Sequence, residues 1–340
     1  MRLRRSDPSK PGIRRIGRGR GFSYEVEGRA ITDAPTLDRI RALVLPPAWR
    51  DVWICPDDRG HIQATGVDAA GRRQYRYHDE WRIKRDAAKF EHVQEFARGL
   101  RRLRRVVARD LAGQGLTRSR VLAAGARVLD AAALRVGGEA YARDDEVLGE
   151  GTFGLATLRR DHVQVRGEVL TFCFPGKGAA QVECEVRDEA LARVVRALLR
   201  RNDPSEELLA HWTGRQWCDV RSADLNAYLR EASGLEISAK DFRTWHATVG
   251  AAVALAMAPT PRSRTAQRRA VAAAMRQTAQ LLGNTPAVAR SAYVDSRVVD
   301  RFAHGETIPA PRDAEDVTAA FADRPAWERA ERAVLDLLTG

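Results

Sequence analysis

The sequence predicts an α+β protein with a small N-terminal domain that contains a β-sheet and a larger, mainly α-helical domain with a small β island. Three observations lead to this prediction. Short runs rich in β-branched and aromatic residues, separated by turn residues, fill the chain up to about residue 90. From Glu91 the texture changes to long Ala/Leu/Arg segments typical of helices. The 340 residues also exceed what one ordinary core accommodates.

The N-terminal part divides into an arm and a domain. Residues 1–20 carry seven arginines and a lysine among Gly, Pro and Ser, which predicts a flexible basic arm. Residues 21–90 form the predicted α+β domain, with a helix near Leu37–Leu45 that stops at Pro46. Its expected strands are Phe22–Val26, Val52–Cys55, Ile62–Val67 and Gln74–His78.

Residues 91–310 form the predicted helical domain, and residues 311–340 a C-terminal tail with an amphipathic helix at 325–338. The expected helices of the larger domain are 91–113, 120–136, 187–201, 223–232, 239–257, 263–282 and 286–293. The expected strands of its β island are Leu155–Arg159, His162–Arg166, Val169–Phe174 and Gln181–Val186.

Composition indicates a globular, DNA-binding class. Hydrophobic residues make up 44% and charged residues 30%, the balance of a folded globular chain. The net charge of +12 and the pI near 10.2 favour a polyanionic partner, and double-stranded DNA is the partner we expect. Only five of the 57 basic residues are lysine, so each lysine is informative as a possible proton donor.

Several other classes are disfavoured by the sequence. Arginines interrupt every apolar run, so no membrane span is expected, and the N-terminus has no secretory signal. The four cysteines read as reduced thiols, although Cys173 and Cys184 could face each other across two strands. The seven histidines lack metal-ligand spacing and no nucleotide-binding loop occurs, so no metal, cofactor or nucleotide is expected. We therefore expect a cytoplasmic protein, located at the nucleoid if the source is bacterial.

Two arginines stand out by position. Arg135 lies on the apolar side of a helix that we expect to end at Val136-Gly137-Gly138. The structural alternative is an arginine at the edge of that apolar side, with its charged end in solvent. Arg243 falls in or near the first turn of a helix, where the macrodipole disfavours a cation. A bound phosphate would reverse that penalty, and a local ion pair with Asp241 is the structural alternative.

A lysine and a tyrosine complete the pattern. Lys177 lies in a glycine-rich turn between two expected strands, as a solvated tip or as a proton donor on a hairpin. Thr285-Pro286 predicts a helix start, so Asn284 lies just outside the helix that carries Tyr293 and the two side chains can converge. The alternative for Tyr293 is an ordinary core tyrosine.

In this order Arg135, Lys177, Arg243, Asn284 and Tyr293 resemble the catalytic set of bacterial and poxviral type IB DNA topoisomerases. The surrounding motifs resemble that family as well. They are Arg135-Val-Gly-Gly with Tyr141, Gly154-Leu-Ala-Thr-Leu-Arg, Phe174-Pro-Gly-Lys177, Lys240-Asp-Phe-Arg243-Thr and Gly283-Asn-Thr-Pro with Ser291-Ala-Tyr293. In the N-terminal domain, Gln74, Tyr75, Arg76 and Tyr77 resemble the DNA-contacting strand, and Tyr141 and Lys240 are further expected DNA contacts. One position departs, because Asn284 stands where many members have histidine.

The resemblance implies an enzyme that relaxes supercoiled DNA through a 3′-phosphotyrosyl intermediate, without metal or ATP. Tyr293 would be the nucleophile and Lys177 the general acid, while Arg135, Arg243 and Asn284 would stabilise the transition state. The departure at Asn284 limits that residue to hydrogen bonding, since an amide cannot transfer a proton. A monomer that clamps duplex DNA between its two domains, with a linker near Phe90, would suffice.

Two alternatives remain from the sequence. A tyrosine recombinase shares the Arg, Lys, Arg and Tyr pattern, but it usually has histidine where this chain has Lys240. A non-catalytic DNA-binding protein would also explain the charge together with Tyr75 and Tyr77. His246, three residues after Arg243, is either a supporting partner of the site or a packed side chain.

Overall fold

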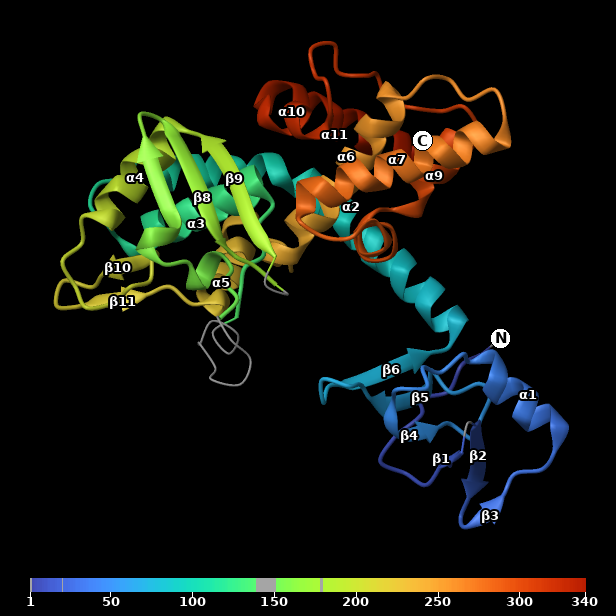
Figure 1. The fold of residues 1–340 in the computed structure, drawn as a ribbon. Helices are drawn as coiled ribbons and strands as arrows, with labels where there is room; N and C mark the ends of the chain where they lie inside the picture. Colours follow the sequence, from blue (N-terminus) through green and yellow to red (C-terminus); the bar gives the residue numbers. More distant parts are fainter. Residues whose placement is uncertain (1, 20, 139–150, 178–179) are drawn as a thin grey trace. The chain divides into compact units, whose positions relative to one another are not determined.

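The computed structural model describes residues 2–19, 21–138, 151–177 and 180–340. The chain divides into two compact units, Met1–Glu91 and His92–Gly340, and each is treated by itself (Figure 1). No helix in the described part of the chain is both long and apolar enough to cross a membrane.

The first unit is built on a six-stranded antiparallel sheet with the order β3-β2-β1-β4-β5-β6. Its strands are β1 (Ile13–Arg18), β2 (Gly21–Val26), β3 (Arg29–Ala30), β4 (Arg50–Ile54), β5 (Ile62–Val67) and β6 (Arg73–Tyr77). Helix α1 (Ala34–Ala42) starts where the Asp33 carboxylate accepts the Thr36 N–H. Ile40 of α1 packs with Ile54 and Ala64 of the sheet into a small core.

The predicted basic arm over residues 1–20 is wrong for residues 13–18, which form β1 in the interior of the sheet. Ile13 is buried in the small core, while Arg14 and Arg18 are exposed. Strand β1 pairs with β2 on one side and with β4 on the other. The arginines obscured this strand because they fill three of its six positions and interrupt the alternation of apolar and polar residues that is typical of a half-buried strand.

Helix α2 (Asp79–Leu111) is longer than predicted and runs without a break through the boundary between the two units. The sequence suggested a linker near Phe90, yet the chain there is helical. Asp79 and Glu80 in the first turn favour the helix N-terminus, and no proline interrupts the 33 residues. The change in composition at Glu91 marks where one side of the helix begins to pack into the larger core, starting with Val93 and Phe96.

The second unit is mainly helical, as predicted, with a three-stranded antiparallel sheet of order β7-β8-β9. Its strands are β7 (Val163–Arg166), β8 (Val169–Pro175) and β9 (Gln181–Arg187), and a second hairpin, β10 (Ala210–Trp212) with β11 (Trp217–Asp219), was not predicted. Its principal helices are α3 (Arg118–Ala132), α4 (Glu189–Leu199), α5 (Ser222–Ser233), α6 (Ala239–Met257), α7 (Arg264–Leu282), α8 (Pro286–Val288), α9 (Ser296–Ala303), α10 (Val317–Ala322) and α11 (Arg324–Thr339). Cys173 and Cys184 do not face each other, because Cys184 pairs with Phe172 and Cys173 with Glu183 in the register of β8 and β9.

The C-terminal segment is part of the core rather than a tail. Trp327 and Val334 of α11 are fully buried in the same hydrophobic core as α6. Arg104 of α2 forms hydrogen bonds with Asp130 of α3 and with Glu331 of α11. The amphipathic pattern of residues 325–338 therefore belongs to a helix that packs its apolar side against the core.

Candidate active site

A hollow of about 180 Å³ in the second unit gathers three of the predicted site residues. Its walls come from the segment after α3, the tip of the β8–β9 hairpin, helix α6 and the end of α7. Arg135, Lys177 and Arg243 all line it, with Gly283 at the end of α7. Arg135 and Gly283, which are 148 positions apart in sequence, thus share one small concavity.

Arg135 is held by its backbone. Ala133 adopts a left-handed conformation with φ of 49°, which ends α3 at Ala132, four residues earlier than predicted, so Arg135 lies in the segment after the helix rather than on it. The Arg135 carbonyl accepts the Leu155 N–H at 2.9 Å, and the Val136 carbonyl accepts the Ala156 N–H at 2.7 Å. The two arginine Nη atoms reach the Gly283 carbonyl at 3.4 Å.

Two glycines make this backbone contact possible. Gly137 has φ of 81°, and a Cβ added to Gly154 would lie 2.5 Å from the Gly137 Cα. Only glycine at Gly154 lets the two segments approach this closely. The motifs around Arg135 and Gly154, separate in sequence, are therefore one structural element that places the arginine.

Arg243 is almost fully buried on α6, at 4% exposure. Its guanidinium donates to the Ala133 carbonyl at the end of α3 and, at 2.8 Å, to the Leu282 carbonyl at the end of α7. Carbonyls at helix C-termini carry partial negative charge, which offsets the unfavourable position of Arg243 near the start of α6. The alternative ion pair is not formed, since Asp241 instead caps α6 by accepting the Ser238 N–H at 2.8 Å.

The charge of Arg243 is left without an acidic partner. No carboxylate within the described ranges forms an ion pair with Arg243 or Arg135, and the Nε of Arg243 is buried with no hydrogen-bond partner there. Burial lowers the pKa of Arg243 to about 10, and the neighbouring Arg135 acts in the same direction. Such a buried, uncompensated cation is an anion-binding feature.

Lys177 lies at the exposed tip of the β8–β9 hairpin, as the sequence predicted for the connection. Pro175 pairs with Gln181, and the Gly176 N–H donates to the Ala180 carbonyl at 2.8 Å, so the hairpin is paired up to its last residues. The Phe153 N–H donates to the Pro175 carbonyl and joins the hairpin to the segment that precedes Gly154. This arrangement carries an ammonium group to the rim of the hollow.

The break before Tyr293 is confirmed. The Thr285 hydroxyl caps α8, which has Pro286 in its first turn, and the chain then forms one π-helical turn over Ala289–Tyr293. Tyr293 is half-buried, and the Arg243 Cζ lies 5.3 Å from the centre of its ring. Although burial alone would raise it, the positive charges of Arg243, Arg135 and Lys240 bring the pKa of Tyr293 below its usual value.

Asn284 is positioned by the end of α7. Gly283 closes that helix in a left-handed conformation, and the Asn284 N–H donates to the Ala279 carbonyl at 3.0 Å. Both side-chain polar atoms of Asn284 are buried and have no hydrogen-bond partner within the described ranges. No hydrogen bond joins this amide to Tyr293, so their convergence stays a prediction. An unpartnered buried amide is a polar group for which a ligand can provide the missing bonds.

His246 does not lie in this hollow. It is fully buried, accepts the Trp327 N–H at Nδ1 over 3.1 Å, and has Asp130 3.4 Å from its Nε2. Asp130, His246 and Glu331 come close enough together to resemble a metal-ligand set. Arg104 pairs with both of these carboxylates and Arg324 pairs with Asp130, so the acidic charge is already balanced by guanidinium groups.

The predicted DNA-contacting strand, β6, divides into two faces. Tyr75 and Tyr77 share one face, with ring centres 6.0 Å apart and nearly parallel, and Tyr75 is 45% exposed. Gln74 and Arg76 point the other way and bond within the unit, to Asp68 at 2.8 Å and Asp79 at 2.9 Å respectively. The stacked tyrosines are thus the available contact surface of β6, and Arg76 holds the strand to the start of α2.

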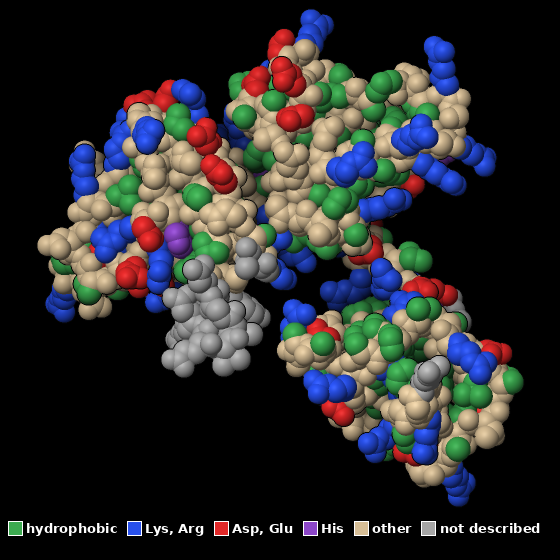
Figure 2. All heavy atoms as spheres, in the orientation of Figure 1, with side chains coloured by type: hydrophobic (Ala, Val, Ile, Leu, Met, Phe, Trp, Pro, Cys, Tyr) green, Lys and Arg blue, Asp and Glu red, His purple; other side chains and the backbone are tan. Residues whose placement is uncertain are grey.

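Lys240 and Tyr141 are the remaining predicted DNA contacts. Lys240 is exposed in the first turn of α6 and is one of the charges that act on Tyr293. Tyr141 lies outside the described residues. Figure 2 shows lysine and arginine side chains scattered over the visible face of each unit rather than gathered in one patch.

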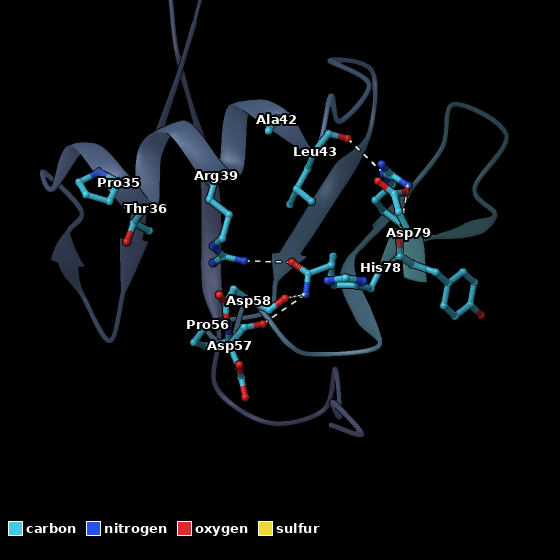
Figure 3. A pocket seen from close by; sticks show the side chains of 13 residues that line it. Pro35, Thr36, Arg39, Ala42, Leu43, Pro56, Asp57, Asp58, His78 and Asp79 are labelled. Atoms are coloured by element: carbon cyan, nitrogen blue, oxygen red, sulfur yellow. Dashed lines mark hydrogen bonds and ion pairs between the residues drawn. The ribbon is translucent and has the colours of Figure 1, made fainter. Parts of the chain in front are cut away.

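A larger hollow of about 820 Å³ occurs in the first unit, between α1 and the sheet (Figure 3). Its polar groups bond to one another. Arg39 donates to the Gln63 side chain at 3.1 Å and to the Cys55 carbonyl at 2.9 Å, and Gln63 donates to the Gly60 carbonyl at 2.8 Å. With these groups already paired, this hollow is less suited to chemistry than the smaller one around Arg243.

Comparison with known proteins gives the class. Residues 78–304 match the family described as "Eukaryotic DNA topoisomerase I, catalytic core". The chain belongs to this type IB DNA topoisomerase family. Residues 21–68 match the family "Bacterial DNA topoisomerase IB, N-terminal domain". The chain is also similar to "DNA topoisomerase 1B" of Acanthamoeba polyphaga mimivirus, at 29% identity over 281 residues that cover 78% of this chain and 80% of that protein.

This membership confirms the resemblance, the α+β fold class and the enzyme class, an isomerase whose substrate is DNA. The match to the catalytic core begins at His78, within the first unit, and includes Tyr293. The catalytic-core family covers the whole hollow, since Arg135, Lys177, Arg243 and Gly283 all fall within residues 78–304.

Proposed function

We propose that the protein relaxes supercoiled DNA by cutting one strand transiently, with Tyr293 as the nucleophile. The single observation that carries the proposal is the place of the Arg243 guanidinium. It is buried, has no acidic partner within the described ranges, and lies 5.3 Å from the Tyr293 ring. A phosphodiester brought to the tyrosine would meet that charge directly.

In the proposed step, the Tyr293 Oη attacks a backbone phosphorus. The new bond is Oη–P, and the bond that breaks joins phosphorus to the 5′ oxygen, which leaves a 3′-phosphotyrosyl link and a free 5′-hydroxyl. Arg243 and Arg135 stabilise the charge that develops on the phosphoryl oxygens, and the Asn284 amide donates a hydrogen bond to one of them. The lowered pKa of Tyr293 favours loss of the phenol proton to solvent water before the attack.

Lys177 supplies the proton in this proposal. An alkoxide is a poor leaving group near neutral pH, so the 5′ oxygen needs a general acid. The Lys177 ammonium sits at the rim of the hollow, and it can protonate that oxygen as the P–O bond breaks. Rotation of the free strand then removes supercoils, and the reverse reaction restores the duplex. Neither a metal ion nor a nucleotide enters these steps, and one chain provides all the groups.

The test is relaxation of a negatively supercoiled plasmid by the purified protein in the presence of a chelator and without ATP. We expect relaxed circles, and a covalent protein–DNA adduct when the reaction is stopped with detergent. Tyr293→Phe is expected to bind DNA with unchanged affinity and to form no adduct. Strand exchange between defined sites without relaxation would indicate a recombinase instead, and an adduct in the Phe variant would show that another residue is the nucleophile.

A further inference from the structure

Helix α6 touches the Tyr293 segment at a second point, five residues after Arg243. The side chain of Thr248 is 1% exposed and lies in the stretch of α6, Asp241–Leu255, in which every residue is buried. Its hydroxyl accepts the Asp295 N–H at 3.1 Å and lies 3.3 Å from the Tyr293 carbonyl, to which it can donate. One hydroxyl therefore joins the backbone groups on both sides of Val294.

Ordinary helix chemistry does not account for this contact. Buried threonines often donate back to the carbonyl four residues earlier, and the Thr248 hydroxyl lies 3.0 Å from the Thr244 carbonyl. That hydrogen bond uses only the hydroxyl proton. The lone pair that accepts the Asp295 N–H is a separate interaction across 47 residues.

The segment beyond Tyr293 is anchored at the same place. Asp295 is 2% exposed, and its carboxylate accepts the Arg297 N–H at 3.0 Å and caps α9. The Val294 N–H donates to the Ala289 carbonyl and closes the π-helical turn. Thr248 is thus the link between this turn, the start of α9 and the helix that carries Arg243.

We propose that Thr248 is a positioning residue for strand cleavage, one that holds the Tyr293 backbone so that the phenol stays beside Arg243. The inference rests on the proposed role of Tyr293 as the nucleophile. Arg243 and Thr248 stand on one rigid helix, about 7.5 Å apart along its axis. The two contacts fix the tyrosine at its ring and at its main chain, and displacement of a reacting group by about 1 Å can cost roughly 100-fold in rate.

The experiment compares Thr248→Val, which removes the hydroxyl at nearly constant volume, with Thr248→Ser, which keeps it. The measurement is the single-turnover rate of adduct formation on a saturating linear duplex. We expect the Val variant to be about 10- to 100-fold slower and the Ser variant to stay within about threefold of the unchanged protein. We also expect the DNA affinity to be unchanged when each Thr248 substitution is combined with Tyr293→Phe, which prevents cleavage during the measurement. In the Val variant the ionisation of Tyr293 should shift upward, because the phenol is no longer held beside the guanidinium.

Thr278→Val is the matched control. Thr278 is fully buried on α7 and donates to the Ala274 carbonyl at 2.9 Å, so it shares the burial and the back-bond of Thr248 without the link to the tyrosine segment. The proposal predicts an unchanged cleavage rate for this control. Equal slowing in both Val variants, or a full cleavage rate in Thr248→Val, would overturn it.

Two further comparisons separate a loss of positioning from a loss of stability and from a failure of the proposed function. If Thr248→Val melts at a much lower temperature, Thr248→Cys provides a side chain of similar size that is weak as donor and acceptor, and it should slow cleavage in the same direction. A full rate in the Cys variant also overturns the proposal. Failure of the proposed function is distinguishable, since it appears as an adduct that persists in Tyr293→Phe, whatever the Thr248 variants do.

Discussion

The guanidinium of Arg243 lies over the ring of Tyr293, with its Cζ 5.3 Å from the ring centre. This contact joins the most buried cation of the hollow to the tyrosine that ends the π-helical turn. It has two consequences. The phenol ionises more readily than an ordinary tyrosine, and a phosphate that reaches the phenol also reaches a guanidinium that has no acidic partner among the described residues.

The first prediction concerns the ionisation of Tyr293. Its folded-state pKa lies below the usual value near 10, so as pH rises its phenolate forms before that of an unfolded chain. The favourable interaction is fully present above the unfolded pKa and is lost as pH falls through the folded one. Ultraviolet titration should show one phenol that ionises early and is missing in Tyr293→Phe. In Arg243→Ala that phenol should ionise at higher pH; an unchanged curve would contradict the assigned cause.

The second prediction is that Arg243→Lys is not conservative. Lysine cannot donate to both the Ala133 and Leu282 carbonyls in the planar geometry of a guanidinium, and its ammonium would lose a bidentate contact with phosphate. We expect a fall in the cleavage rate of about 100- to 1,000-fold, comparable to the loss of an oxyanion-stabilising group. Single-turnover cleavage measures it. Arg39→Lys, in the hollow of the first unit, is the control and should cleave at the full rate.

The third prediction tests Lys177 as the general acid. Lys177→Ala should slow cleavage of ordinary DNA by about 100- to 10,000-fold. A duplex with sulfur in place of the bridging 5′ oxygen has a leaving group that needs no proton, so the variant should cleave it at close to the full rate. Arg243→Lys should stay slow on this sulfur-substituted duplex. If the Lys177 variant remained equally slow on both duplexes, its role would be contact rather than proton transfer.

The fourth prediction concerns the glycine contact that places Arg135. A Cβ at Gly154 would lie 2.5 Å from the Gly137 Cα, so Gly154→Ala must push the Arg135 segment away. We expect about 1–3 kcal/mol of destabilisation together with a loss of cleavage. Gly167→Ala, at an open hairpin turn with φ of 56°, is the comparison. It should cost some stability through backbone strain but leave the cleavage rate of the folded protein unchanged.

Much of this architecture could be predicted from the sequence because local rules and packing agree. The helix at 239–257 and the hairpin around Lys177 follow from periodicity and turn residues, and the break before Tyr293 follows from Thr285-Pro286. The two-part organisation also follows, since the change in composition near Glu91 matches the boundary between the two units.

The features that the sequence did not predict have physical explanations. Strand β1 was not predicted because three of its six residues are arginines and Ile13 is its one fully buried residue. Ala133 ends α3 in a left-handed conformation that favours glycine, so no local signal marks the end of that helix. The carbonyls that bind Arg243 come from segments more than 30 residues away, and backbone groups leave no trace in side-chain patterns.

The burial of α11 has a consequence for truncation of the chain. Trp327 and Glu331 complete the surroundings of His246 and Arg104. A variant cut before Arg324 would leave Arg104 without Glu331 and Asp130 without Arg324, in a core that also holds Trp327. Because α6 belongs to that same core and carries Arg243, residues far from the hollow are expected to decide whether the hollow forms.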